Sequence, residues 1–262
     1  MRKILISLAV VGALLVGYYT LGQKISTDSG KENAVQVVRI GTEGAYAPFN
    51  FTDEQGTLKG FDIEIAQAVC KAAKLECSFT SQDWDGLIPG LLARKFDMIA
   101  SSMSITDERA KAIAFSNHYY RTPIRFVSLK DSTLVTTKEG LRGKKLGAQR
   151  ATTSALYLQE NFGDVAEIKL YDTWETARLD LSAGRVDAIL SDAISSWHWL
   201  QTPQGVNAQF RGETAYVDSG IGFGMRKSDA DLLSKINAGL AEIIKSGEYD
   251  TINKKYFPFS IY

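Results

Sequence analysis

The stretch at residues 101–109, Ser-Ser-Met-Ser-Ile-Thr-Asp-Glu-Arg, constrains the fold of this chain more than any other. It follows an apolar run at 96–100 that predicts a short buried strand, and it leads into residues 109–115, which begin like a helix. Thr106 is a favoured N-cap residue, and the acidic residues after it suit the positive end of a helix dipole. The sequence therefore predicts a strand, a hydroxyl-rich loop and a helix start in succession.

The same stretch supplies the chemical groups of an anion site. Serine hydroxyls at a strand end let a ligand approach the backbone closely, and the planar guanidinium of Arg109 suits bidentate binding of a carboxylate. Together with the free N–H groups of a helix N-terminus, they make a site of the size of a carboxylate. A plain strand–loop–helix junction with a solvent-facing arginine explains these residues equally well.

Strand-like and helix-like segments alternate along the chain. In the first half, apolar runs predict strands at 37–42 and 75–80, and helical spacing predicts helices at 61–73 and 87–93. This alternation predicts a parallel α/β architecture. The second half continues it with predicted strands at 125–129 and 186–190 and predicted helices at 155–161, 174–183 and 232–244.

Composition argues against several classes of protein. The 30 basic and 30 acidic side chains cancel, so we expect no nucleic-acid partner. The chain has no Gly-rich phosphate loop, and its two His and two Cys are too few for a zinc cluster, so we expect no cofactor and no metal. It also lacks a Gly-x-Ser-x-Gly elbow and a histidine placed for a triad, which leaves no candidate catalytic residue.

Residues 1–22 predict export. A basic start is followed by an apolar run at 4–21, as in a secretory signal. The run is nearly as long as the roughly 20 residues that span a bilayer, so a signal cleaved near Gly22 and an uncleaved anchor both stay open. Residues 23–35 are polar and predict a flexible leader.

Cys70 and Cys77 lie at the end of one predicted helix and the start of the next strand. In an exported protein, two cysteines this close predict a disulfide first, and two buried thiols are the alternative. The loop between them is short, so the stabilisation is expected to be below the ~3 kcal/mol of a 15-residue loop.

From residue 39 to the end, the chain resembles the periplasmic amino-acid-binding proteins of the polar amino acid transport type. The Ser-Ser-x-Ser-Ile-Thr-x-x-Arg pattern at 101–109 is similar to the segment that grips the ligand α-carboxylate in that family. Further matches follow in order at 39–49, 60–64, 83–89, 184–188, 247–250 and 254–257. Within the family, the resemblance is greatest to the lysine/arginine/ornithine-, histidine- and opine-binding proteins, and the basic-amino-acid binders among them carry a disulfide at the positions of Cys70 and Cys77.

The resemblance implies a two-lobed α/β fold, the type II periplasmic-binding-protein fold. Each lobe is expected to hold a mostly parallel sheet flanked by helices, with the ligand in the cleft. Lobe 1 would comprise residues 36–121 and 217–262, and lobe 2 residues 122–216. The protein would act in the periplasm as a monomer and deliver an amino acid to an inner-membrane ABC permease.

The ligand's two backbone charges each need a partner, because a buried charge is costly unless it is paired. The resemblance assigns the ligand carboxylate to Arg109 and the ammonium to Asp192, for which a helix cap or a loop residue is the alternative. The residues expected to assist are Ser104, Thr152 and Thr153 at the carboxylate, and Ser101 and Ser102 at the ammonium.

The ligand side chain is expected between Tyr46 and Trp84, whose aromatic faces attract a cation. The resemblance places Glu43 and Asp62 at positions that meet the distal cation of a basic amino acid. Asp62 is equally well explained as the N-cap of its own helix. Gln149 adds a polar contact from the second lobe, where Ala151 replaces a more usual glycine.

These features predict an extracytoplasmic solute-binding protein that closes by hinge motion on arginine, lysine or ornithine, and not an enzyme. An opine such as octopine or nopaline is the next hypothesis, followed by histidine. Two other classes stay open, since a fold does not determine a function. One is an enzyme similar to cyclohexadienyl dehydratase, and the other is a sensor domain, which an uncleaved anchor at 4–21 would favour.

Overall fold

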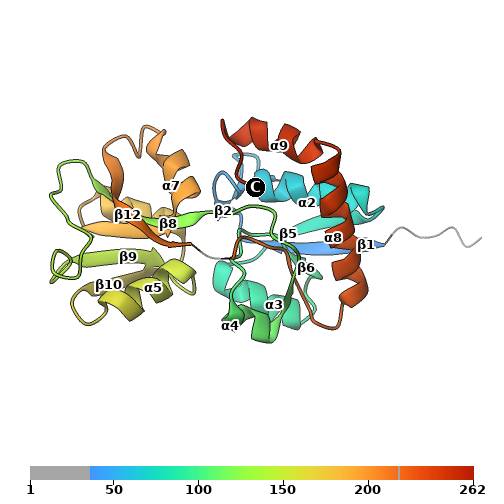
Figure 1. Cartoon of the computed structure of the whole chain (residues 1–262), viewed down its shortest axis with the longest axis horizontal. Helices are drawn as coiled ribbons and strands as arrows, with labels where there is room; N and C mark the ends of the chain where they lie inside the picture. The colour runs from blue at the N-terminus through green and yellow to red at the C-terminus, as the bar shows by residue number, and fades with distance from the viewer. Residues whose placement is uncertain (1–35, 218) are drawn as a thin grey trace, which may run out of the picture. The chain divides into compact units, whose positions relative to one another are not determined.

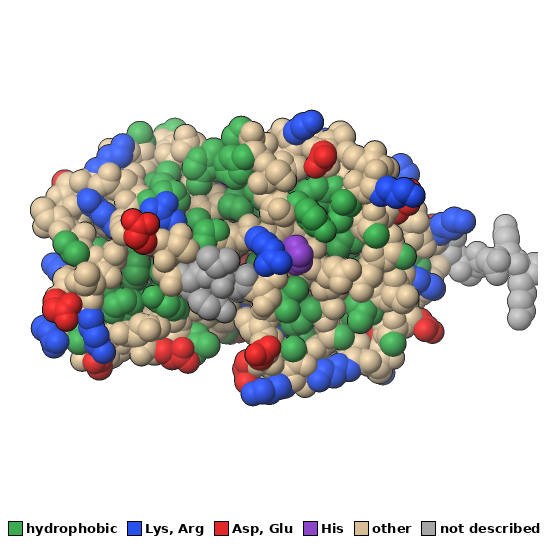
Figure 2. Space-filling model, in the orientation of Figure 1, with side chains coloured by type: hydrophobic (Ala, Val, Ile, Leu, Met, Phe, Trp, Pro, Cys, Tyr) green, Lys and Arg blue, Asp and Glu red, His purple; other side chains and the backbone are tan. Residues whose placement is uncertain are grey.

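Two five-stranded sheets, each flanked by helices, form the two lobes in the computed structural model, which describes residues 36–217 and 219–262 (Figure 1). The predicted export segment at 1–22 and the leader at 23–35 lie outside the described residues. In the described part of the chain, no helix is long and apolar enough to cross a membrane. On the face drawn in Figure 2, basic and acidic side chains are interspersed.

The first sheet has the strand order β5-β1-β6-β13-β7. β1 (Val37–Thr42) pairs in parallel with both β5 (Glu76–Ser81) and β6 (Met98–Ile99). β13 (Gly224–Met225) returns late in the chain and pairs antiparallel with β6 and with β7 (Ala114–Phe115). The remaining elements of this lobe are β2 (Ala45–Tyr46), β3 (Asn50–Thr52), β4 (Leu58–Lys59), α2 (Phe61–Ala72), η1 (Trp84–Gly86), α3 (Leu87–Leu92), α4 (Asp107–Ala112), α8 (Ala230–Lys245) and α9 (Glu248–Tyr256).

The second sheet has the strand order β10-β9-β11-β8-β12. Its first three strands are parallel, whereas β8 runs antiparallel to both of its neighbours. The strands are β8 (Pro123–Leu129), β9 (Lys145–Gln149), β10 (Glu167–Tyr171), β11 (Ala188–Asp192) and β12 (Ala208–Val217), and the helices are α5 (Thr153–Phe162), α6 (Trp174–Ser182) and α7 (Ala193–Leu200).

The two-lobed α/β fold is confirmed, but both sheets are mixed rather than mostly parallel. The antiparallel strands join segments far apart in sequence, such as Met225 with Met98, and no local pattern shows such a pairing. The strands of the first sheet come from positions before 116 and after 223, and those of the second from 123–217. The lobe boundaries at 121–122 and 216–217 stay a prediction.

Two chain segments connect the lobes side by side. Tyr120 and Ile221 form an isolated antiparallel bridge, and the backbone N–H of Tyr119 donates to the Ile221 carbonyl at 2.8 Å. In the described part of the chain, these paired segments lead from one sheet to the other, so they are the natural place for a hinge.

Local signals predicted most elements correctly, with some misplaced ends. Thr106 is the N-cap of α4, and its side chain accepts from the Arg109 backbone N–H, as predicted. The helix ends at Ala112, however, and not near 115, because Ala114 and Phe115 pair with β13. The helices α7 and α9 were not predicted.

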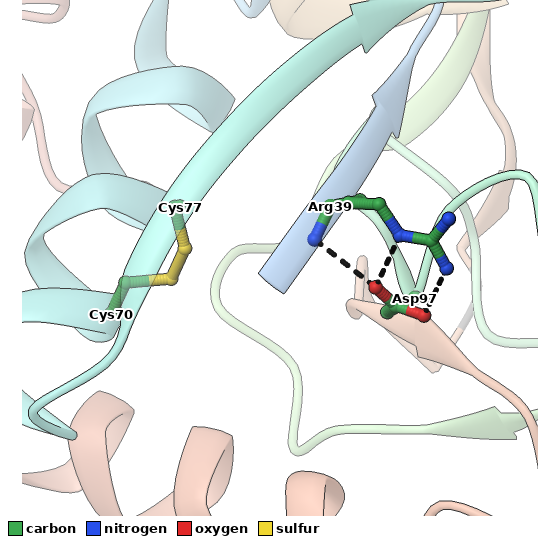
Figure 3. Close-up of a disulfide and its surroundings, with 4 residues drawn as sticks. All are labelled: Arg39, Cys70, Cys77 and Asp97. Carbon is green, nitrogen blue, oxygen red and sulfur yellow. Dashed lines mark hydrogen bonds and ion pairs between the residues drawn. A yellow bond between two sulfur atoms is a disulfide. The ribbon is translucent and has the colours of Figure 1, made fainter. Parts of the chain in front are cut away.

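The predicted disulfide between Cys70 and Cys77 is present and joins the end of α2 to β5, with Cα atoms 6.3 Å apart (Figure 3). The same view shows Arg39 of β1 bonded to Asp97: its Nε and Nη2 each donate to the Asp97 carboxylate at 2.9 Å. This bond, together with a second pair to Arg226, lowers the pKa of Asp97 to about 2. The disulfide thus fastens α2 to β5, and the ion pair fastens β1 to the residue that precedes β6.

Aromatic side chains fill the core beneath α2. Phe61, the first residue of the helix, is fully buried, and its ring contacts those of Tyr119, Tyr249 and Phe257. Because the start of α2 is buried in this cluster, its second residue, Asp62, is carried into the interior as well.

Candidate functional site

A pocket lies where the carboxyl ends of β1, β6, β9 and β11 meet. Ligands of open α/β folds bind at such strand ends. Eleven of the twelve predicted ligand residues line this pocket, and Asp62 does not. The lining residues are Glu43, Tyr46, Trp84, Ser101, Ser102, Ser104, Arg109, Gln149, Thr152, Thr153, Ser154, Leu190, Ser191 and Asp192.

Arg109, in the first turn of α4, is held by both lobes. Its Nη1 donates to the Ser104 carbonyl at 2.9 Å, and its Nη2 donates to the Ala151 carbonyl at 3.1 Å. Its guanidinium carbon lies 5.3 Å from the centre of the Trp84 ring. The planar fork is therefore fixed at the pocket and is suited to grip a carboxylate.

The start of α5 adds a second anion-binding feature on the opposite wall. Thr152 is the N-cap, and its side chain accepts from the Ala155 backbone N–H at 3.2 Å. The next two residues, Thr153 and Ser154, line the pocket and belong to the first helical turn, whose N–H groups have no partner within the helix. The positive end of this helix dipole favours an anion here.

Asp192, at the end of β11, supplies a negative charge to the pocket. The Tyr46 hydroxyl donates to its Oδ2 at 2.7 Å and lies 3.2 Å from the Ser191 hydroxyl. Asp192 occupies the N-cap position of α7 without a side-chain capping bond, and its role toward a ligand stays a prediction. The carboxylate is thus directed toward Tyr46 rather than toward its own helix.

Glu43 and Gln149 meet across the pocket. The Gln149 Nε2 donates to Glu43 Oε1 at 2.6 Å and to the Asp172 carbonyl at 3.0 Å. Both side chains are buried, with exposed fractions of 7% for Glu43 and 5% for Gln149. Burial is the main cause that raises the pKa of Glu43 to about 7, with a further contribution from the charge of Asp83. In the described part of the chain, no ion pair joins Glu43 to a lysine or arginine.

Tyr46 and Trp84 form the aromatic part of the wall, and both are buried. The Trp84 Nε1 donates to the Ala151 carbonyl at 3.2 Å, so this carbonyl accepts bonds from both Trp84 and Arg109. Ala151 itself has a left-handed backbone, with φ of 55°. A glycine adopts that conformation more readily, which agrees with the glycine that the resemblance leads one to expect at this position.

Ser101, Ser102 and Ser104, which follow β6, line the pocket. The Ser101 hydroxyl accepts from the Glu43 backbone N–H at 2.9 Å, and the Ser104 carbonyl holds Arg109. Ser102 has a left-handed backbone, with φ of 51°, and is also buried. The plain-junction alternative for residues 101–109 therefore does not hold, since Arg109 points into a built pocket and not into solvent.

Asp62 lies behind the pocket wall rather than in it. It is not the N-cap of α2, which is Gly60, so the cap alternative for Asp62 is wrong. A direct contact between Asp62 and the distal end of a ligand stays a prediction that this placement does not favour.

Three lining residues were missed by the sequence analysis. Ser154 and Ser191 are immediate neighbours of Thr153 and Asp192, so extending each predicted motif by one residue finds them. Leu190 carries no chemical signal beyond its place in β11. In the described residues, no cluster of three His, Cys, Asp or Glu side chains is arranged to hold a metal ion.

A family model and curated relatives match most of this chain. The family model described as bacterial extracellular solute-binding proteins, family 3, matches residues 38–259. The L-arginine-binding protein of Pseudomonas aeruginosa is 39% identical over 86% of this chain and 89% of its own length. The lysine/arginine/ornithine-binding periplasmic protein of Escherichia coli is 36% identical over 100% of this chain and 99% of its own length.

Solved structures match most of this chain as well. An ancestral arginine-binding protein bound to arginine is 35% identical, with a TM-score of 0.80 over 84% of this chain and 98% of that one. A periplasmic His/Glu/Gln/Arg/opine family-binding protein from Silicibacter pomeroyi in complex with lysine is 33% identical, with a TM-score of 0.78 over 86% of this chain and 100% of that one.

Proposed function

Since the chain belongs to family 3 of the bacterial extracellular solute-binding proteins, we propose that it binds a basic amino acid between its lobes for an ABC importer. One observation carries the proposal. A single pocket brings together a cation, Arg109, and two separate carboxylates, Asp192 and Glu43. An amino acid with a cationic side chain presents the complementary set of one negative and two positive groups.

The ligand carboxylate is assigned to Arg109 and the start of α5, because both offer N–H donors and positive charge. The ammonium is assigned to Asp192, with Ser101 and Ser102 as further acceptors. This pose leaves the side chain to run along Trp84.

The distal cation of the side chain then reaches Glu43. A buried carboxylate without a cationic partner is unfavourable, which is why its pKa is raised to about 7. A guanidinium or ammonium at this point restores the ionised form, whereas a neutral side chain does not. This difference is the proposed basis of the preference for arginine, lysine or ornithine.

Closure around the ligand is supported by bonds that cross the cleft. Tyr46 donates to Asp192, Gln149 donates to Glu43, and both Trp84 and Arg109 donate to the Ala151 carbonyl. In each bond one partner belongs to the first predicted lobe and the other to the second. A ligand held by Arg109 and by α5 would join the lobes in the same way.

The names of the relatives support the same ligand class. Those reported above are arginine- and lysine/arginine/ornithine-binding proteins, and the solved structures hold arginine and lysine. We infer from this that the protein is a periplasmic binding protein and not an enzyme, and that its partner is an inner-membrane permease.

Calorimetric titration of refolded, ligand-stripped protein tests the proposal. Refolding matters because a tight binder carries its ligand through purification. We expect tight binding of arginine, lysine or ornithine and weaker binding of histidine and glutamine. Tight binding of octopine with weak binding of arginine would reassign the pocket to opines. No heat with any of these ligands would overturn the binding proposal and reopen the enzyme and sensor hypotheses.

A further inference from the structure

Asp62 is a buried carboxylate that the proposed ligand pose does not use. Its side chain is fully buried, with an exposed fraction of 0%. Three neutral donors hold it: the Tyr119 hydroxyl at 2.7 Å, the Asn50 Nδ2 at 2.8 Å and the Ser102 hydroxyl at 2.9 Å. In the described part of the chain, no lysine or arginine pairs with it. A buried charge of this kind is expensive to keep, so a role in the neighbouring site is the natural explanation.

The bond from Ser102 controls what that residue offers to the pocket. A hydroxyl has one proton to donate, and Ser102 donates it to Asp62. Its oxygen is then left only as an acceptor on the pocket side, where Ser102 is a lining residue. The bond also helps to hold the left-handed backbone of Ser102, which residues other than glycine rarely adopt.

The bond from Asn50 links Asp62 to a second part of the pocket wall. Because the Nδ2 of Asn50 donates to Asp62, its Oδ1 is turned toward the Gly44 backbone N–H, from which it accepts at 3.0 Å. The Ser101 hydroxyl lies 3.5 Å from the same Oδ1 and accepts in turn from the Glu43 backbone N–H. Asp62 is thereby linked through Asn50 to Ser101 and Glu43 of the lining.

We propose that Asp62 is a positioning residue of the ligand site, which acts through Ser102 to present an acceptor to the ammonium group of the bound amino acid. This inference rests on the proposed function, because it takes the ammonium to lie at Asp192 and the serines. It differs from a direct contact with the ligand's distal cation, since it acts on the group that all amino acids share.

A double-mutant cycle on arginine binding tests the proposal. The variants are Asp62→Asn, Ser102→Ala and the pair together, each titrated with arginine by calorimetry and each melted by circular dichroism. The single variants are expected to weaken binding about tenfold each, as for a lost hydrogen bond to a charged group. The double variant is expected to bind arginine with an affinity within about twofold of that of the weaker-binding single variant. The reason is that Asp62 acts through the hydroxyl that Ser102→Ala removes.

Glu64→Gln is the matched control, because Glu64 lies on the same helix and its carboxylate accepts from Lys255 and Tyr256 of α9, away from the pocket. It should lower the melting temperature without changing arginine affinity. If Asp62→Asn does not give a cooperative melt, Asp62→Ser takes its place, since it removes the carboxylate but leaves a small polar group.

Two results would overturn the inference alone. One is wild-type affinity in Asp62→Asn, and the other is a double variant whose loss is the product of the two single losses. Wild-type protein that binds no amino acid would instead overturn the proposed function and this inference with it.

Discussion

The two walls of the pocket are built in different ways. The wall from the first lobe is a network of side chains bonded to one another, with Asp62 and Asn50 behind Ser101 and Ser102. The wall from the second lobe consists of a strand end, a helix start and the side chains of Gln149 and Asp192. The serines of the first wall are thus held from within their own lobe, whereas the second wall supplies groups that matter once the lobes meet. Substitutions in the two walls, compared by their effects on ligand affinity and on stability, test this difference.

Asp192→Ala in the second wall is expected to have the largest effect. It removes the proposed partner of the ligand ammonium and would leave a buried charge unpaired, which typically costs about 3–5 kcal/mol, or a loss of more than about a hundredfold in affinity. Titration with arginine, lysine and glutamine should show this loss for every ligand. Asp164→Asn, which removes an exposed partner of Lys138, is the control and should bind normally. An affinity within about tenfold of the wild type in Asp192→Ala would remove Asp192 from the site.

Arg109→Lys in the first wall is expected to come next. The substitution keeps the charge but loses the planar fork that binds the Ser104 and Ala151 carbonyls and that we propose to bind the ligand carboxylate. Affinity for all amino acids should fall about 10- to 100-fold, as measured by calorimetry. Arg39→Lys, at a structural ion pair outside the pocket, should change stability and leave affinity alone. Wild-type affinity in Arg109→Lys would show that a positive charge is sufficient and that the planar guanidinium is not needed.

Glu43→Gln should affect basic ligands selectively, by about tenfold for arginine and little for glutamine. The wild-type protein should also show a pH dependence that this variant lacks. Burial raises the pKa of Glu43 to about 7 in the free protein, and a bound cation favours the ionised form. Binding therefore releases a proton, and arginine affinity should fall as the pH drops below about 7. A flat profile from pH 5 to 8, measured by titration in several buffers, would contradict a distal cation at Glu43.

Replacement of both Cys70 and Cys77 by Ser should have the smallest effect on binding. The disulfide joins α2 to β5 away from the lining residues, so only stability should change. Its short loop predicts a loss below ~3 kcal/mol in the free energy of unfolding, measured by urea denaturation. A large loss of affinity at unchanged stability would show that the first wall depends on this edge of the lobe.

Local chemistry explains which parts of the site were predictable. The Thr106 cap and the disulfide each depend on residues within seven positions of one another, and both are present. Most of the lining residues were predicted through the resemblance, which transfers positions along the chain. The place of Asp62 was not predicted, because its burial depends on how Phe61 packs against Tyr119, Tyr249 and Phe257.

The sequence by itself determined the local elements around the site: the strand, hydroxyl loop and capped helix at 101–109, and the polar residues that end strands. Only the tertiary structure decided the antiparallel half of each sheet, the bond between Glu43 and Gln149, and the raised pKa of Glu43. The reason is one of range. Caps and turns are set by neighbours a few residues away, whereas strand pairing and the burial of a charge are set by groups that meet only after the chain has folded.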